Sequence, residues 1–153
     1  RTPSYIARLI VLVLLLFAPP GNVDAQSIDI HFERLSVERG LPFSEVDCVL
    51  QDMKGFMWFG TLDGLNRFDG YSFKVYKHDP RNPKSLNNNA IWTLYEDDSG
   101  TLWIGTSGGL DKFDRMTESF TLHSEEPRNA KSLSNNEVRA ICEDRTDALW
   151  IST

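Results

Sequence analysis

Short apolar segments separated by turn-forming residues recur along most of the chain. Three of them align residue by residue: 46–52, 91–97 and 138–144. Each is apolar at most positions before it ends in aspartate, as expected for a strand covered on both faces. A tryptophan follows six residues after each of these aspartates. These tryptophans are Trp58, Trp103 and Trp150, so the period is 45 and then 47 residues. A fixed period of this length predicts a repeat architecture.

Each repeat predicts four short strands joined by turns. An Asp-x-x-Gly turn follows the first strand at 52–55 and 97–100, and Asp first with Gly fourth suits a type I turn. Gly64 and Gly109 open a second turn, after which strands three and four complete the sheet. No amphipathic helical stretch intervenes, which indicates an all-β chain. A four-stranded unit of about 45 residues is the size of a β-propeller blade.

The predicted fold class is therefore all-β, a partial β-propeller of about two and a half four-stranded blades preceded by a signal peptide. The recurring Trp, Phe and Leu side chains are predicted to pack between blades, because one sheet cannot bury both its faces alone. The predicted segments are a signal peptide (1–25), a lead-in segment with a ring-closing strand (26–45), blade 1 (46–90), blade 2 (91–137) and a truncated blade 3 (138–153).

The first 25 residues have the three parts of a secretory signal peptide. Arg1 and Arg8 give a positive start, residues 9–18 are ten apolar residues, and 23–25 provide modest side chains for cleavage. A membrane-spanning helix needs about 20 apolar residues, so an uncleaved anchor is the less favoured alternative. A buried core helix is less favoured still, because the apolar run has no polar face.

Composition narrows the functional classes. The chain is 41% hydrophobic with a net charge of −6, which argues against a nucleic-acid partner. Cys48 and Cys142 lie at different registers of their repeats, so we expect two small buried side chains and no disulfide. The three histidines are scattered, and the spacing suggests no metal site, no cofactor and no catalytic residue.

Three motifs together carry a family resemblance. They are Asp-x-x-Gly-x-x-Trp-[Ile/Phe]-Gly-Thr, then Gly-Leu-x-[Arg/Lys]-Phe-Asp, and a linker with Ser-Leu-x-x-Asn at its end. In combination they resemble the two-component regulator propeller repeat over residues 32–153, and residues 32–42 look like the usual start of such arrays. The third copy departs from the pattern, with Asp147 at the turn glycine and Ser152 at the strand glycine. Asp tolerates a left-handed turn.

The resemblance implies a role in sensing. Such propellers form the extracytoplasmic input region of bacterial sensor proteins, mostly hybrid or ordinary sensor histidine kinases and sometimes diguanylate cyclases. Many of the kinases look like detectors of polysaccharide fragments. The resemblance thus implies an exported, periplasmic input module of a homodimeric parent protein, held at the membrane only by further C-terminal regions, with no enzymatic activity of its own.

Two other functional classes remain open. Residues 98–103 have a passing likeness to the Asp-box of sialidases, although Met53 occupies the corresponding Asp position in the first copy. No arginine triad or pair of catalytic carboxylates stands out for a propeller enzyme. A WD40-like scaffold is disfavoured by Trp-[Ile/Phe]-Gly-Thr in place of Trp-Asp, and by the export signal.

Positions that vary between repeats are candidates for ligand recognition. The second residue of the first strand is Asp47, Trp92 or Arg139, and asparagine-rich turns precede the second and third copies. Amides beside an aromatic ring suit an oligosaccharide or another small extracellular ligand. The candidate site residues are Asn88, Asn89, Trp92, Asn135, Asn136 and Arg139. The favoured alternative is that the asparagines only stabilise turns through their side chains.

The sequence predicts an open arc of blades, because a propeller closes with at least four. Residues 28–35 alternate like a strand and are expected to complete the last blade of a full ring. Isolated residues 26–153 should therefore associate through exposed blade faces and strand edges. Light scattering and calorimetry test this expectation, and a monodisperse monomer that melts cooperatively would contradict it.

Overall fold

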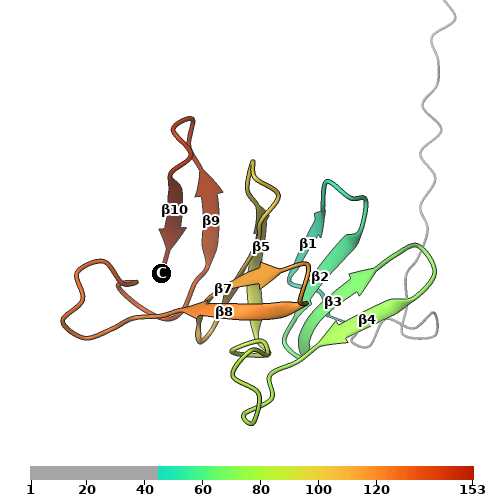
Figure 1. Ribbon diagram of the computed structural model, residues 1–153, viewed down its shortest axis with the longest axis horizontal. Helices are drawn as coiled ribbons and strands as arrows, with labels where there is room; N and C mark the ends of the chain where they lie inside the picture. The colour runs from blue at the N-terminus through green and yellow to red at the C-terminus, as the bar shows by residue number, and fades with distance from the viewer. Residues whose placement is uncertain (1–44) are drawn as a thin grey trace, which may run out of the picture. The chain divides into compact units, whose positions relative to one another are not determined.

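The computed structural model describes residues 45–153, and every described element is a β-strand (Figure 1). Contacts divide the chain into two units, Arg1–Glu33 and Arg34–Thr153, and the description below concerns the second. The predicted signal peptide and the ring-closing strand lie outside the described residues. Over residues 45–153, no helix has the length and apolar character that crossing a bilayer requires.

The strands form antiparallel sheets in simple chain order, which confirms the all-β prediction. The first sheet, termed blade 1, contains β1 (Cys48–Gln51), β2 (Met57–Thr61), β3 (Gly64–Phe68) and β4 (Phe73–Tyr76). The second, blade 2, contains β5 (Ile91–Glu96), β6 (Leu102–Thr106), β7 (Gly109–Asp114) and β8 (Ser119–His123). The third, blade 3, has the two described strands β9 (Ala140–Glu143) and β10 (Leu149–Ser152).

The first strands of the three sheets, β1, β5 and β9, lie side by side (Figure 1). Blades 1 and 2 share one apolar core. Trp58 is fully buried there and packs with Phe113 from blade 2, at 5.3 Å between ring centroids, and with Tyr76 from its own sheet, at 5.9 Å. The prediction of tryptophan between blades therefore holds for Trp58. Trp150 is 64% exposed, because no described sheet covers that side of blade 3, as expected for the last sheet of an open arc.

One hydrogen bond recurs in all three sheets. The aspartate that ends each first strand accepts the indole N–H of the tryptophan six residues later through Oδ2, and backbone N–H groups of its own turn through Oδ1. The Oδ2 bonds are Asp52–Trp58 at 2.8 Å, Asp97–Trp103 at 2.8 Å and Asp144–Trp150 at 2.7 Å. Each aspartate thus fixes both the turn and the rotamer of its tryptophan, and we term this pair the Asp–Trp lock.

Burial and hydrogen bonding act in opposite directions on the lock at Asp52. Removal of its carboxylate from water raises the pKa, but the bonds from Trp58, Arg115 and Phe56 outweigh that effect and hold the pKa below its usual value. The carboxylate therefore stays ionised in the seam between blades 1 and 2.

Glutamates at the ends of β5 and β9, the first (inner) strands of blades 2 and 3, form hydrogen bonds to the preceding sheet. Glu96 Oε2 accepts the backbone N–H of Met53 at 2.7 Å, and Glu143 Oε2 accepts that of Asp98 at 3.0 Å. These two bonds join equivalent positions of successive repeats. They show that the period of the sequence is also a period of inter-sheet contacts.

Arg115 joins the first two sheets a second time. Its guanidinium lies 2.6 Å from Asp52 Oδ2 and 2.6 Å from Glu96 Oε1, and its Nε donates to the carbonyl of Gly100 at 3.2 Å. The side chains of Asp52 and Glu96 are 0% and 8% exposed. A partly buried cation therefore neutralises two buried carboxylates, which would each carry a large desolvation cost if left unpaired.

Glycine in the Trp-x-Gly-Thr motif reflects close packing between sheets. A Cβ on Gly60 would collide with Cys48 Sγ and lie 2.6 Å from Ile91 Cγ2 of the next sheet. In blade 3 the same position holds Ser152, and its strand partner is Ala140. The serine therefore faces alanine in place of a larger side chain across the strand pair, and within residues 45–153 no following sheet packs against it.

The other departure of the third copy also keeps its geometry. Asp147 adopts a left-handed φ of 60°, where Gly55 and Gly100 have φ of 87° and 80°. The Asp144–Trp150 bond is preserved beyond this turn. The left-handed position is thus satisfied by aspartate, as the sequence indicated.

We predict that Gly105→Ala destabilises the seam between blades 2 and 3. The added Cβ would collide with Thr93 Cγ2 and lie 2.8 Å from Val138 Cγ1 and 3.0 Å from the Val138 carbonyl oxygen. Overpacking of this kind costs about 1–3 kcal/mol. The measurement is urea unfolding of the complete exported region. Ser152→Ala is the matched control, since it keeps the Cβ already present, and equal stability of Gly105→Ala and wild type would contradict the prediction.

Candidate functional site

The two linkers between sheets, residues 77–90 and 124–137, share one set of hydrogen bonds. Asn89 Oδ1 accepts the backbone N–H of His78 at 2.8 Å, and Asn136 Oδ1 accepts that of Glu125 at 2.6 Å. These bonds close each linker on itself. Asn89 and Asn136 therefore act in the turns, which is the favoured alternative for their role.

The other two candidate asparagines also use their oxygen atoms locally. Asn88 Oδ1 accepts the backbone N–H of Ala90 at 2.9 Å, and Asn135 Oδ1 accepts that of Glu137 at 2.8 Å. These bonds position the chain immediately before the first strands of blades 2 and 3. A ligand role for the asparagines stays a prediction, and it would rest on their amide nitrogens.

Trp92 and Arg139 come together across the seam between blades 2 and 3. The guanidinium carbon of Arg139 lies 4.0 Å from the centroid of the Trp92 ring, within the range of a cation–π contact. The indole N–H donates to Ser107 Oγ at 2.8 Å. Residues Asn88, Trp92, Ser107 and Arg139 form what we term the Trp92–Arg139 patch.

Asn88 lies beside this patch through the turn that carries Ser107. A Cβ on Gly108 would be 3.2 Å from Asn88 Cβ, so the asparagine sits against the turn. Asn135 reaches the patch only through Glu137, which is ion-paired to Arg139. The structure thus brings together Asn88, Trp92 and Arg139, with Asn135 at their edge.

Ser107 was not among the residues predicted from sequence. It occupies the turn after Trp-x-Gly-Thr, where blade 1 has Leu62. The signal was available, because this position varies between repeats as Asp47, Trp92 and Arg139 do. Its nearness to Trp92 depends on the pairing of β5 with β6, in which Ile91 lies opposite Thr106.

A buried carboxylate holds the linker that carries Asn88. Asp111 Oδ2 accepts both the backbone N–H and the side-chain Nδ2–H of Asn87 at 2.9 Å, while Thr106 Oγ1 donates to Asn87 Oδ1 at 3.1 Å. Asp111 is fully buried, and its Oδ1 has no partner among the described residues. Burial raises the pKa of Asp111 to about 6, although the bonds from Asn87 lower it.

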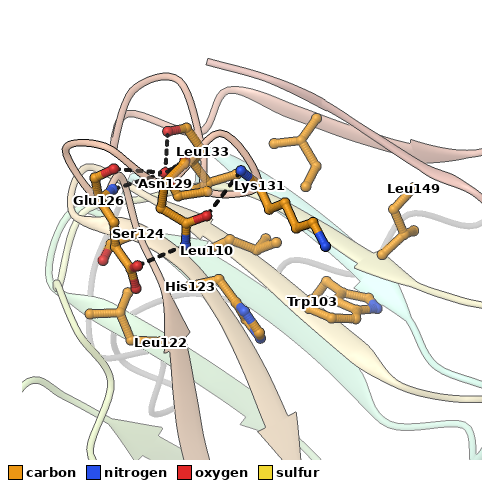
Figure 2. A pocket seen from close by; sticks show the side chains of 12 residues that line it. Trp103, Leu110, Leu122, His123, Ser124, Glu126, Asn129, Lys131, Leu133 and Leu149 are labelled. Carbon is orange, nitrogen blue, oxygen red and sulfur yellow. Dashed lines mark hydrogen bonds between the residues drawn. The ribbon is translucent and has the colours of Figure 1, made fainter.

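A pocket of about 320 Å³ opens between blade 2 and blade 3. Trp103, Leu110, Leu133 and Leu149 are among its apolar lining residues, and Lys131 extends its ammonium group into it (Figure 2). Its size would suit a small ligand.

Comparison of the repeats indicates that this pocket is the counterpart of the core between blades 1 and 2. The positions of Trp103 and Leu110 correspond to Trp58 and Leu65 of blade 1, which are fully buried in the core shared by blades 1 and 2. Phe113 and Phe120, from the third and fourth strands of blade 2, fill that core. Over residues 45–153, blade 3 contributes no strands of this kind. We therefore interpret the pocket as an incompletely filled packing interface between blades 2 and 3 and not as a ligand site. The candidate site is placed at the Trp92–Arg139 patch.

Comparison with protein families finds a match to the repeat. The profile described as two component regulator propeller matches residues 40–63, 85–108 and 132–153. Histidine kinase P4 from Formosa agariphila is 38% identical to this chain over 66 residues, which is 43% of this chain and 5% of that protein.

Two solved structures from B. thetaiotaomicron are also similar. The extracellular domain of the proposed hybrid two-component system BT3049 is 33% identical with a TM-score of 0.72, covering 79% of this chain and 17% of that one. The extracellular domain of the proposed hybrid two-component system BT4673 is 31% identical with a TM-score of 0.60, covering 71% and 15%. The chain thus spans a small part of the length of each relative.

We predict that Asp111→Asn stabilises the protein at neutral pH. The pKa of Asp111 rises from 3.8 to about 6 on folding, so the folded state binds protons more tightly. Its stability falls as pH increases from about 4 to 6, and the full penalty, about 1–3 kcal/mol, is present above pH 6. The measurement is the free energy of unfolding from pH 4 to 8.

Asparagine fits this position in blade 1, where Asn66 is 1% exposed. The advantage of Asp111→Asn should therefore shrink towards zero near pH 4. A variant that is less stable than wild type at pH 7 would show that the ionised carboxylate is needed to hold Asn87.

Proposed function

We propose that this chain, which is built from two-component regulator propeller repeats, is part of the ligand-sensing extracytoplasmic input region of a bacterial sensor histidine kinase. The observation that carries the proposal is the joint match of the repeat profile and of an extracellular domain with a TM-score of 0.72. In this proposal the chain itself is non-catalytic, and phosphoryl transfer belongs to other regions of a homodimeric parent protein. The chain is exported and works on the periplasmic side of the inner membrane.

The Trp92–Arg139 patch supports a role in ligand binding. Trp92 lies in β5 of blade 2 and Arg139 immediately precedes β9 of blade 3. A ligand that contacts both would therefore bridge two sheets. Such a ligand would favour one relative position of the sheets over another, which is the requirement for a binding event to be transmitted. The proposed ligand is an oligosaccharide or another small extracellular molecule.

The recurring residues support a division of labour. The Asp–Trp lock recurs in all three sheets. The glutamate that precedes its aspartate recurs in blades 2 and 3, where blade 1 has Gln51, and these residues form the scaffold. The position occupied by Asp47, Trp92 and Arg139 changes from sheet to sheet. Trp92 lies at an irregularity in the register of β5 with β6, and the pairing beyond it matches that of β1 with β2. Recognition can therefore vary at this end of the strands while the fold stays constant.

We predict that Trp92→Ala weakens ligand binding on the order of tenfold or more, because the aromatic face and the support for Arg139 are both lost. The test screens oligosaccharides against the complete exported region by calorimetry, then repeats the positive titrations with the variant. Tyr71→Ala is the control, since Tyr71 lies outside the patch and is 96% exposed.

A second measurement tests signalling. The full-length protein in vesicles should change its autophosphorylation when the ligand identified by calorimetry is added. Equal affinity for wild type and Trp92→Ala would remove the patch from the binding site. A cyclase output in the parent protein, in place of a kinase, would overturn the assignment of the output.

A further inference from the structure

Hydrogen-bond donors dominate what the Trp92–Arg139 patch offers to a ligand. The side-chain oxygens of Asn88 and Asn135 are already used by backbone N–H groups, so their amide nitrogens are the groups left to bind. Arg139 has five N–H donors and no acceptor. A patch of this kind is complementary to a ligand rich in acceptors.

Arg139 differs from the arginines that hold the fold together. Arg67 and Arg115 have side chains that are 23% and 16% exposed, and they pair with carboxylates from distant parts of the chain. The side chain of Arg139 is 51% exposed, and the only carboxylate paired with it within residues 45–153 is Glu137, two residues away. Arg67 and Arg115 therefore serve the fold through their ion pairs, whereas the guanidinium of Arg139 is held in place with N–H groups still accessible to a ligand.

The stack on Trp92 fixes the orientation of this guanidinium. At 4.0 Å from the ring centroid, Arg139 is restrained against the indole while half of its side chain remains exposed. A planar guanidinium that is held in place loses little entropy when its N–H edge binds a carboxylate in a bidentate pair.

Building on the proposed function, we infer that the ligand carries a carboxylate group and that Arg139 binds it. The Glu137 carboxylate, whose side chain is 47% exposed, occupies the place of that group in the unliganded protein. Binding exchanges one carboxylate for another on the same guanidinium, and Asn88 and Asn135 add amide donors beside it. The ring of Trp92 packs against one face of the guanidinium.

The charges around the patch oppose this binding only weakly. Glu137 is exposed, and repulsion between exposed charges that lie more than about 8 Å apart is largely screened at physiological salt. The net charge of −6 slows the approach of an anion more than it weakens a short contact. Selection for a carboxylate therefore depends on contact with Arg139, which substitution tests directly.

The experiment titrates the complete exported region with uronate-containing oligosaccharides, each paired with its carboxyl-reduced neutral counterpart. We expect the acidic member to bind roughly tenfold or more tightly than its neutral counterpart. Arg139→Gln should abolish this preference, and Arg139→Lys should restore only part of it because a lysine lacks the planar fork. Arg145→Gln is the matched control, because Arg145 is an exposed arginine in the turn between β9 and β10.

Three outcomes separate this inference from the proposed function. Loss of preference in Arg139→Gln, with normal melting and normal preference in Arg145→Gln, supports the inference. Neutral sugars that bind as tightly as acidic ones, or a preference that survives Arg139→Gln, overturn it and leave the sensor proposal intact. If neither acidic nor neutral oligosaccharides bind the wild-type region, the proposal that it senses oligosaccharides fails and the inference fails with it.

Discussion

The bond from an aspartate carboxylate to an indole N–H is the interaction on which the rest of this structure depends. It occurs once in each sheet, and the same carboxylate closes the turn that leads to the second strand. The bond fixes the tryptophan rotamer. In this rotamer Trp58 presents its ring to Phe113 of the next sheet, which packs against it. A hydrogen bond to an ionised group contributes about 1.5–3 kcal/mol, but its larger effect is to give every sheet the same shape towards its neighbour.

Contacts between sheets follow from that shape. The glycine two residues after the tryptophan of the lock lets Ile91 approach blade 1 and Val138 approach blade 2. Glu96 and Glu143 reach back to the preceding turns. Ile91 and Val138 are thereby held in the two seams. The next residue is left at the end of the strand, where Trp92 and Arg139 meet. The candidate site is thus a consequence of the same packing that joins the sheets.

The predicted architecture followed from repetition. Residues that recur at a fixed spacing must make the same contacts in each copy, so the strand order, the Asp-x-x-Gly turns and the all-β fold could be read from the alignment of the copies. Asp147 and Ser152 look like defects in that alignment, but the first adopts the left-handed φ of 60° and the second faces Ala140. Exposure of Trp150 agrees with the open arc of blades predicted from the count of repeats, because burial depends on what covers each sheet.

What the sequence by itself determined is the scaffold: a repeating four-stranded sheet whose aspartates, glycines and tryptophans occupy equivalent positions. It also singled out the variable positions, including Trp92 and Arg139. Only the tertiary structure decided what those side chains do. Stacking of Arg139 on Trp92 joins residues from different sheets, and Arg115 meets Asp52 from 63 residues away. Such contacts depend on the distance between sheets and on burial, which no spacing along a single chain contains.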